Sequence, residues 1–438
     1  MSNLTQIRKA ENIARKKRLR ILWLCFAVIL VVLPLLATKF GLTILTQICV
    51  ASVFALAYNM LLGQGGMLSF GHAVYFGLGG YASIHLMEYV GTGGAPIPLV
   101  LTPIFGGLFG LVAALLIGSF STRRAGTVFA MISFGIAELV AASAIILVGF
   151  FGGEEGMSSD RTMGPSFFGY EMIPQIEVYY FAAVWFFLAT FAMYYFSRSP
   201  AGRMANAVRD NAERAQFIGY NPQKIRLVSF VASGFFAGIA GGIFAIQYEI
   251  VTDSNLNTAA SGLVMLQAYI GGIGYFVGPV IGAIVMTLLN TVVSGMTDLW
   301  LLYTGLLFIG TVLLAPNGLT GLIMMHTDAY RNGKLSTLVK PYLIGLIPLT
   351  ASFVGIISLV EMFSHRNEQT VGDDVMPLFF MNIDVSTSEA WIAFTILSLA
   401  GIIGLRFTIP MVRTAWHEAN EALTLPASPT KQEGAKNE

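Results

Sequence analysis

Eight long stretches of this sequence contain no Asp, Glu, Lys or Arg, and they constrain the fold more than any other feature. They are residues 21–38, 40–87, 89–122, 178–197, 227–248, 254–297, 299–327 and 341–360. A membrane-spanning helix needs about 20 apolar residues, and lipid offers backbone groups no hydrogen-bonding partner, so each stretch is predicted to be helical. Only 11% of the residues are charged, whereas soluble proteins contain about 25%. The sequence therefore predicts an all-α, polytopic integral membrane protein.

Two of these stretches are too long for a single crossing of the membrane. Since a helix rises about 1.5 Å per residue, residues 40–87 would reach about twice the thickness of a bilayer. We expect this stretch to turn back at Gly63-Gln64-Gly65-Gly66. Residues 254–297 are expected to turn back at Gly271-Gly272-Ile273-Gly274 and Gly278-Pro279, because glycine and proline interrupt helices.

The expected architecture is a helical bundle of about ten segments up to residue 325, followed by two helices near 341–360 and 390–409. This pattern and the distribution of charge divide the chain into four regions. They are a basic N-terminus (1–20), a transmembrane core (21–325), a two-helix extension (326–416) and a tail with two prolines and mixed charges (417–438), which we expect to be disordered.

Basic residues in the short loops predict the orientation, because cytoplasmic loops of membrane proteins are enriched in Lys and Arg. Seven of the first 20 residues are basic, which places the N-terminus in the cytoplasm. Alternation then places Arg123-Arg124 and the loop 198–226 inside, and both termini inside. A basic cluster before an apolar run also occurs in secretory signals, but no small-residue cleavage site follows cleanly, so a retained first span is preferred.

The segment 199–220 has the pattern of a short amphipathic helix in a cytoplasmic loop. Ser199-Pro200 provides an N-cap and a proline at the first helical position, and Gly219 with Asn221-Pro222 provides the stop. The apolar stripe comprises Met204, Val208, Ala212, Ala215 and Ile218, and the charged face comprises Arg203, Arg209, Asp210, Glu213 and Arg214. Such a helix either lies on the membrane surface or docks its stripe into a groove of a cytoplasmic partner.

Short motifs in this segment resemble the corresponding loop of ABC-importer permeases. Glu213-Arg214-Ala215, with Gly219 four residues later, keeps the spacing of the EAA loop, although Arg214 stands where Ala is usual. Gly202-Arg203, residues 207–211 and residues 217–221 resemble the loop of branched-chain amino acid permeases of the M-type (LivM-like). The resemblance implies that this helix couples the movement of separate ATPases to the membrane domain. The residues that would carry this role are Arg203, Arg209, Asp210, Glu213, Ala215 and Gly219.

Three glycine-rich blocks extend the resemblance over about residues 40–325. Residues 62–72 resemble the family's Gly-x-x-Gly-Gln-Leu-Ser-Leu-Gly-His stretch, with Gln64 shifted relative to the usual order. Residues 271–282 match a further block, and Ala315-Pro316-Asn317-Gly318-Leu319 matches the end of the shared core. The resemblance therefore implies a helical bundle of the ABC-importer permease type.

The resemblance also implies a function, a permease subunit of an ATP-driven importer in a bacterial inner membrane. The implied partners are a homologous second permease (LivH-like), two ABC ATPase subunits and an extracytoplasmic solute-binding protein. The implied substrates are branched-chain or other hydrophobic amino acids, but relatives handle urea, short amides and aromatic acids, and the residues do not choose among them. The sequence contains no P-loop, hydrolase or dinucleotide motif, which argues against an enzyme and against a cofactor.

Neutral polar residues lie beside both predicted reversals. They are Asn59, Gln64, Ser69, His72 and Tyr75 around the first, and Gln267 beside the second. Interrupted segments mark the substrate site in secondary transporters, because their backbone groups are exposed only where they line a cavity. By analogy we expect these side chains to line the path of a neutral or zwitterionic solute. The neighbouring glycines are expected to allow close helix packing instead.

Two ionisable residues within the spans have two interpretations each. His72 could titrate near neutral pH, but a hydrogen-bonded packing role is favoured. Glu138 is a candidate for function as an intramembrane carboxylate, unless Ser133 or Ser143 satisfies it. Paired intramembrane charges are common in self-sufficient secondary transporters and channels, the alternative function for this chain, and Glu138 has no such pair in its stretch.

Two regions could contact further proteins outside the cell membrane. The glycine-rich loop after residue 152 carries Glu154 and Glu155, whose carboxylates would meet the solute-binding protein or lie in a merely solvated loop. The extension 326–416 has an acidic loop between its two helices, and it could contact the binding protein or another subunit.

Overall fold

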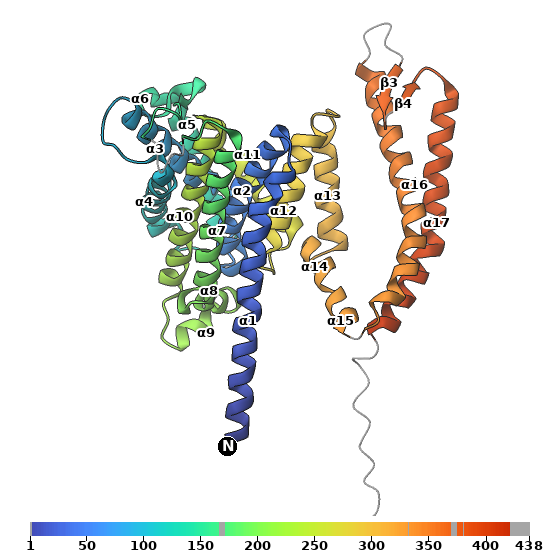
Figure 1. The fold of residues 1–438 in the computed structure, drawn as a ribbon, viewed down its shortest axis with the longest axis horizontal. Coiled ribbons are helices and arrows are strands. Elements are labelled where there is room, and N and C mark those ends of the chain that lie inside the picture. Colours follow the sequence, from blue (N-terminus) through green and yellow to red (C-terminus); the bar gives the residue numbers. More distant parts are fainter. Residues whose placement is uncertain (1, 166–170, 332, 369–374, 380, 421–438) are drawn as a thin grey trace, which may run out of the picture. The chain divides into compact units, whose positions relative to one another are not determined.

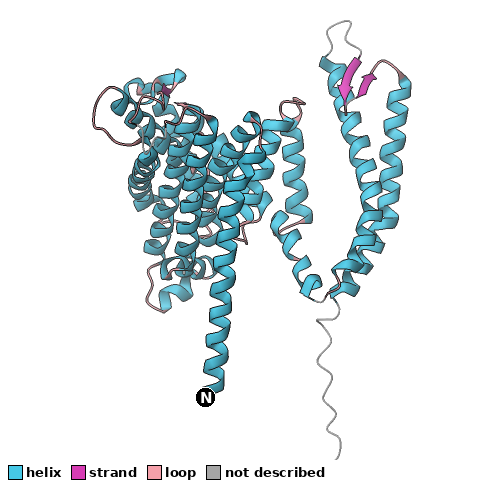
Figure 2. Cartoon of the chain, viewed as in Figure 1, coloured by secondary structure: helices cyan, strands magenta, loops and turns pink. Residues whose placement is uncertain are grey.

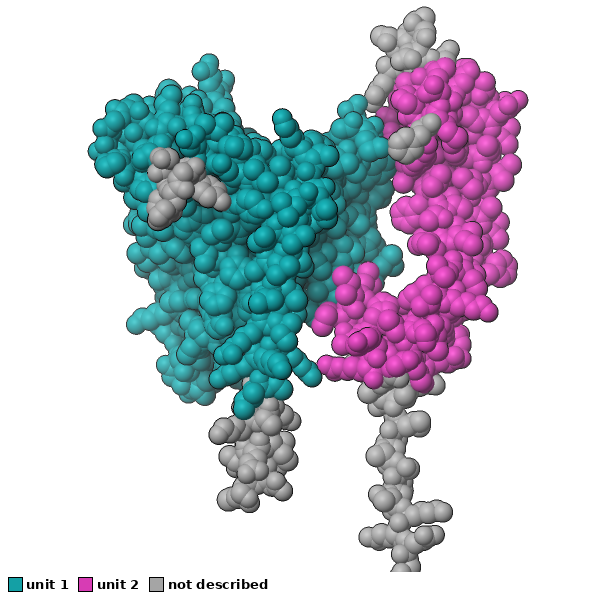
Figure 3. All heavy atoms as spheres, in the orientation of Figure 1, with its two compact units in different colours: residues 1–321 teal, residues 322–438 magenta. Residues whose placement is uncertain are grey.

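The computed structural model describes residues 2–165, 171–331, 333–368, 375–379 and 381–420 (Figure 1). Helices dominate these residues, and the strands are two short antiparallel ribbons (Figure 2). One ribbon pairs β1 (Met157–Ser158) with β2 (Ile250–Val251), and the other pairs β3 (Val375–Leu378) with β4 (Met381–Asp384). The chain divides into two compact units, Met1–Gly321 and Leu322–Glu438, which are coloured separately in Figure 3.

Long helices make up unit 1. They are α1 (Ser2–Val32), α2 (Lys39–Asn59), α3 (Ala73–Gly91), α4 (Thr102–Ser121), α5 (Thr127–Ile146), α7 (Gln175–Arg198), α10 (Pro222–Tyr248), α11 (Thr258–Gly271), α12 (Gly278–Leu288) and α13 (Trp300–Leu314). Short elements join them: η1 (Leu33–Leu36), η2 (Met60–Gln64), η3 (Leu99–Leu101), α6 (Val148–Phe151), η4 (Gly153–Glu155), η5 (Asp253–Asn255) and η6 (Leu289–Val293).

Eight helices of the described residues are long and apolar enough to cross a membrane, or nine if the bent pair of α13 and the helix that follows it is one span. Six of the eight belong to unit 1. With the bent pair and with α3, α11 and α12, they give the ten segments that the sequence predicts. The prediction of an all-α polytopic membrane protein is confirmed.

Both predicted reversals are confirmed. Helix α2 passes into the π-helical turn η2, and the chain then returns along it, since Tyr58 contacts Ser69 and Phe54 stacks on both His72 and Phe76. Helices α11 and α12 pack against each other around the turn from Gly272 to Val277. The length argument succeeds because a helix cannot exceed the bilayer without leaving it.

Helix α10 lies at the centre of unit 1, in contact with α2, α3 and α4. Small residues allow this close packing, as in other membrane bundles. A methyl group on Gly79 of α3 would lie 2.5 Å from the Cα of Gly238, and one on Gly110 of α4 would lie 2.5 Å from the carbonyl oxygen of Gly234. Gly79 therefore allows the close helix packing that was expected of the glycines near the first reversal.

The predicted helix over 199–220 is two helices, α8 (Pro200–Asp210) and α9 (Ala212–Phe217). Its ends are as predicted: the Ser199 hydroxyl accepts from the Gly202 N–H at 3.3 Å, and Gly219 adopts a left-handed φ of +92°. The continuous helix was a wrong prediction, because Asn211 has an extended backbone and its side chain accepts from the Arg214 N–H at 2.9 Å. Asparagine is a strong N-cap and starts a new helix there.

Unit 2 is a helical hairpin. Helix α16 (Leu335–Glu368) packs along α17 (Ser388–Asn420), preceded by α15 (His326–Arg331), and the short helix α14 (Gly318–Met324) crosses the unit boundary. The two predicted C-terminal helices are therefore confirmed, and each is longer than expected. The predicted disorder of 417–438 is wrong for residues 417–420, which belong to α17, and residues 421–438 lie outside the described residues.

Candidate functional site

The segment Gly65–His72, between η2 and α3, is non-helical and mostly buried in unit 1. Side chains from three helices bond to its backbone and to the first N–H of α3. The Tyr58 hydroxyl of α2 donates to the Ser69 carbonyl at 3.1 Å, and the Phe70 N–H donates to Ser133 Oγ of α5 at 3.0 Å. The Ala73 N–H donates to Ser261 Oγ of α11 at 2.9 Å. Protein groups therefore satisfy this unwound backbone, as they must wherever lipid offers no hydrogen-bonding partner.

His72 ends this segment and is fully buried. The Ser233 hydroxyl donates to the Ala57 carbonyl at 2.5 Å and lies 3.2 Å from His72 Nε2. Since the hydroxyl has one hydrogen, it accepts from Nε2–H, which leaves Nδ1 as an acceptor. The rings of Phe54, Tyr58 and Tyr75 surround the imidazole at centroid distances of 5.8, 5.3 and 5.7 Å. These contacts support the packing interpretation of His72.

Four of the six residues expected along a substrate path hold a buried acceptor without a hydrogen-bond partner among the described residues. The atoms are Asn59 Oδ1, Gln64 Oε1, His72 Nδ1 and Gln267 Oε1. Of the other two, Ser69 Oγ accepts from the Gly71 N–H at 3.3 Å, and the Tyr75 ring packs against the rings of His72 and Phe230. A buried acceptor without a donor is costly, and it is explained by water or by a ligand that carries donors.

The three glycine-rich blocks meet backbone to backbone. A methyl group on Gly63 of η2 would lie 2.7 Å from the Ile273 carbonyl oxygen in the α11–α12 turn. In the same turn Gly272, with φ +111°, faces the backbone of Asn317. A methyl group on Gly318, whose φ is +68°, would lie 2.8 Å from the Gly271 carbonyl carbon. We call this contact of η2, the α11–α12 turn and the start of α14 the three-break junction.

Helix α8 reaches this junction through Arg209. The Arg209 Nη1 donates to the Gly63 carbonyl, and the aliphatic part of the side chain covers Gly66. Asp210 Oδ1 accepts a hydrogen bond from Nε at 3.0 Å and forms an ion pair with Nη2 at 2.9 Å, so one carboxylate oxygen orients the guanidinium. Arg209 and Asp210 therefore interact within the chain.

Two of the five residues of the apolar stripe, Val208 and Ala215, pack on the chain itself. Val208 and Ala215 are each 2% exposed, and α8 contacts α7, α10 and η2. The interpretation that this stripe docks into a partner therefore fails for Val208 and Ala215, because the unit's own helices cover them. Arg203, Glu213 and Gly219 are exposed as expected. The apolar residues exposed at this end are Phe217 (88%), Ile218 (68%) and Tyr220 (46%).

Glu138 is bonded differently from the expectation. It accepts from the Thr258 hydroxyl at 2.5 Å, at the first residue of α11, where a carboxylate is favoured by the helix dipole. Ser133 and Ser143 donate to carbonyls of their own helix instead, each at 2.7 Å. Their hydroxyls are therefore not the groups that satisfy Glu138.

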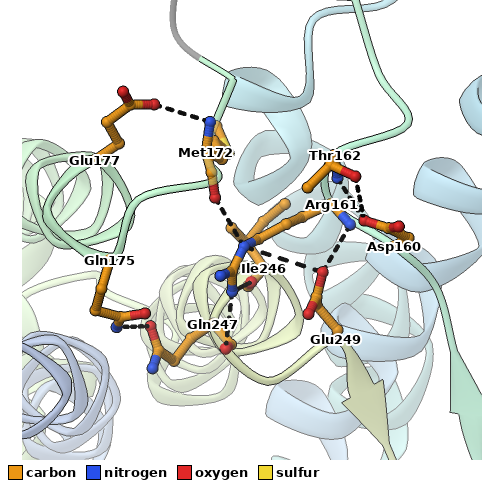
Figure 4. A network of polar contacts seen from close by, with 9 residues as sticks. All are labelled: Asp160, Arg161, Thr162, Met172, Gln175, Glu177, Ile246, Gln247 and Glu249. Carbon is orange, nitrogen blue, oxygen red and sulfur yellow. Dashed lines mark hydrogen bonds and ion pairs between the residues drawn. The ribbon is translucent and has the colours of Figure 1, made fainter. Parts of the chain in front are cut away.

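A polar network at the opposite end of α10 was not predicted (Figure 4). Arg161 donates through its Nε to the Met172 carbonyl at 2.9 Å and through Nη1 to the carbonyls of Ile246 and Gln247, both at 3.3 Å. Its backbone N–H donates to Glu249 Oε1 at 2.9 Å. A cation at a helix C-terminus satisfies the last carbonyls and the dipole. The only sequence signal was an arginine within an acidic loop.

The exposed carboxylates of Glu154 and Glu155 lie outside this network, in η4. The loop nearby is held by Asp160, whose Oδ1 accepts from the N–H and the hydroxyl of Thr162, both at 2.7 Å. These hydrogen bonds hold the pKa of the Asp160 carboxyl below its usual range.

Comparison with known families gives one match that covers most of this architecture. Residues 40–315 match the family described as "Branched-chain amino acid transport system / permease component". The matched region begins in α2 and ends at Ala315, so it contains the unwound segment, α8, α9 and the first two parts of the three-break junction.

Individual relatives are similar over much of the chain. The high-affinity branched-chain amino acid transport system permease protein LivM of Salmonella typhimurium is 25% identical over 314 residues, covering 67% of this chain and 72% of that protein. LivM of Escherichia coli is 24% identical with the same coverage. The probable branched-chain amino acid transport permease protein LivH of Methanocaldococcus jannaschii is 24% identical over 236 residues, covering 50% of this chain and 72% of that protein. No solved structure matches the chain significantly.

Proposed function

The chain belongs to the family of permease components of branched-chain amino acid transport systems, and on this premise we propose that it imports branched-chain or related amino acids, driven by separate ATPase subunits. The observation that carries this proposal is the exposed end of α8 and α9 combined with the contact of Arg209 to an interrupted span. A chain that is moved by another protein needs both a docking surface and a link from it to the membrane helices.

The proposed docking surface, here called the coupling surface, combines exposed charges with exposed aromatic and aliphatic side chains. It consists of Arg203, Glu213, Phe217, Ile218, Gly219 and Tyr220. Phe217 is almost fully exposed, and large apolar groups surrounded by charges mark protein contacts. We assign this surface to the ABC ATPases, of which two would be needed for a pair of permeases.

The proposed orientation in the membrane follows from the basic residues at the end of unit 1 that carries α8. Arg203 lies in α8, Lys224 and Arg226 lie in the first turns of α10, and Arg123 and Arg124 follow α4, whose end packs against Leu227 and Phe230 of α10. An excess of basic residues marks the cytoplasmic side. The coupling surface and both termini would then lie in the cytoplasm of a bacterial cell. Glu154 and Glu155 would lie outside, where they are available to a solute-binding protein.

The proposed substrate path runs beside the unwound segment. The acceptors on Asn59, Gln64, His72 and Gln267 suit a solute that brings several donors, as the ammonium group of an amino acid does. Similarity to both LivM and LivH supports a second, homologous permease as the partner. Substrates such as urea, amides or aromatic acids remain for the uptake experiment to separate.

Reconstitution tests the proposal. The chain, its second permease and tagged ATPases are purified together and placed in liposomes with the binding protein, and uptake of labelled leucine is measured with and without ATP. We expect uptake only with ATP, and loss of the ATPases from the purified complex in Glu213→Arg and Gly219→Trp. Retention of the ATPases by folded variants would contradict the coupling surface. Uptake by the chain alone under an ion gradient would instead establish a self-sufficient transporter.

A further inference from the structure

We propose that Arg209 is the positioning residue that carries movement of α8 to the three-break junction, through the Gly63 carbonyl, rather than a contact to the ATPase. This inference rests on the proposed function, because it assumes that α8 is moved by a partner. It assigns a separate role to one residue within that function.

The side chain of Arg209 is held on both sides. Asp210 accepts a hydrogen bond from Nε and forms an ion pair with Nη2, and Nη1 is left to donate to the Gly63 carbonyl. The planar guanidinium fixes these directions relative to each other, which a flexible ammonium does not. Among the described hydrogen bonds this is the one that joins α8 to η2.

Gly66 supplies the second contact. Its φ of +64° lies in the left-handed region, and a methyl group there would lie 2.5 Å from Arg209 Cγ and 3.3 Å from Cβ. The turn after η2 is thus shaped to receive the arginine stem. A glycine with a left-handed φ and a close neighbour is difficult to replace by any other residue.

Backbone contacts continue from Gly63 to the other breaks. The Cα of Gly63 lies against the Ile273 carbonyl, and Gly272 in that turn lies against Asn317 and Gly318. Where backbone packs directly on backbone, no side chain lies between that could change its rotamer to accommodate a displacement. A shift of Gly63 therefore displaces the α11–α12 turn and the start of α14 as well. The three spans would move as one group.

The same contact reaches the proposed substrate path. A methyl group on Gly63 would overlap Asn59 Oδ1, so the Asn59 amide lies directly over the residue that Arg209 binds. Gln64 follows Gly63 in the chain, and both Asn59 and Gln64 hold unpaired buried acceptors among the described residues. A displacement of the Gly63 carbonyl by Arg209 therefore also moves the side-chain amides of Asn59 and Gln64, which would contact the solute.

The test compares Arg209→Met with Lys224→Met in the full reconstituted complex. Methionine keeps the apolar stem and removes the donor, while Lys224 is an exposed cation at the same end with no side-chain bond among those described. We expect Arg209→Met to assemble with the ATPases but to transport at least tenfold less leucine per ATP hydrolysed. Lys224→Met should match the wild type.

A spin label gives a readout that a loss of folding or docking does not imitate. Gly274 lies in the α11–α12 turn with open space around its Cα, so Gly274→Cys can be labelled after the free cysteines Cys25 and Cys49 are replaced. We expect ATP to change the spectrum in the wild-type and Lys224→Met backgrounds and to leave it unchanged in Arg209→Met. If Arg209→Met does not assemble, Arg209→Lys keeps the charge and should show an intermediate loss of transport and of the spectral change.

The outcomes separate the two proposals. Wild-type transport per ATP and a normal spectral change in Arg209→Met, or in Arg209→Lys where that variant is used, would overturn the role of Arg209 alone. Absence of ATP-dependent uptake in the wild type would overturn the proposed function.

Discussion

Ser261 Oγ in α11 accepts a hydrogen bond from the backbone N–H of Ala73, the first residue of α3, at 2.9 Å across 188 residues of sequence. Helix α3 starts directly after an unwound segment, where the N–H groups of Val74 and Tyr75 donate to the carbonyls of Gly71 and His72, both at 3.3 Å, and the N–H of Ala73 has no such backbone partner. The His72 side chain does not cap the helix. The start of α3 therefore depends on a side chain from another helix.

Replacing Ser261 by Ala should destabilise unit 1. The buried N–H of Ala73 would lose its acceptor, which costs about 1–3 kcal/mol of unfolding free energy. Thermal unfolding in detergent measures the change. Ser143→Ala is the matched control, since its hydroxyl bonds to a carbonyl of its own helix and is exposed, so the effect should stay within about 0.5 kcal/mol. Equal unfolding temperatures for the two variants would contradict the capping role.

Arg161→Met should loosen the end of α10. The change removes the donors to Met172, Ile246 and Gln247, and hydrogen bonds to a charged group contribute about 1.5–3 kcal/mol each before relaxation. Hydrogen exchange of residues 157–165 and 246–251 should speed up, because β1 and β2 are joined there. Exchange in α16 serves as the internal control and should not change. Unchanged, slow exchange in the variant would show that the pairing of β1 with β2 is sufficient to hold the C-terminal end of α10.

The loop that contains Asp160 should weaken only in acid. Hydrogen bonds from Thr162 lower the pKa of Asp160 in the folded chain, and an unperturbed Asp has a pKa of about 3.9. The stability that this carboxylate contributes is therefore fully present above about pH 4–5 and is lost as pH falls through the lowered folded value. Asp160→Asn keeps an acceptor oxygen and removes the titration. The unfolding temperature of the wild type relative to this variant should be constant from pH 5 to 8 and should fall below that range.

Phe217→Ala should reduce binding of the ATPases without affecting the fold. The side chain is 88% exposed, so its loss removes no packing within the chain, whereas an aromatic anchor at an interface contributes about 2 kcal/mol or more. We expect at least about tenfold weaker binding by titration with purified ATPase. Met296→Ala is the control, because Met296 is 76% exposed and follows η6, away from α8. Equal affinities for the two variants would remove Phe217 from the coupling surface.

The sequence predicted those parts of the fold that depend on the length of an apolar stretch or on residues close together in the chain. The reversal at Gly63 follows from the length of an uncharged stretch, and the caps at Ser199 and Gly219 follow from residues within one turn. The break at Asn211 was missed because the apolar stripe continues from Val208 to Ala212 across it, although asparagine favours an N-cap over a helix interior.

The candidate site was predicted as a set of residues but not as a set of contacts. Arg209 was expected to couple the ATPases to the membrane domain, but its bond to Gly63, which is 146 residues away in sequence, was not predicted. Arg161 donates to the carbonyls of Ile246 and Gln247, which are 85 and 86 residues away in sequence. Such long-range pairings leave no periodicity or spacing in a single sequence, so only the three-dimensional arrangement reveals them.

Gln267→Met distinguishes a substrate contact from a structural residue. Gln267 Oε1 is buried and has no partner among the described residues, so methionine of similar shape should leave the unfolding temperature equal or higher. If the oxygen accepts from the ammonium group of the solute, the KM for uptake should rise about tenfold or more, since such a bond contributes about 1.5–3 kcal/mol. Gln247→Met is the opposite case, because Gln247 Oε1 accepts from Gln175 Nε2 at 3.1 Å. That variant should unfold at a lower temperature with an unchanged KM. A loss of stability in Gln267→Met without a change in KM would place Gln267 among the packing residues, and the path would then have to run past Asn59, Gln64 and His72.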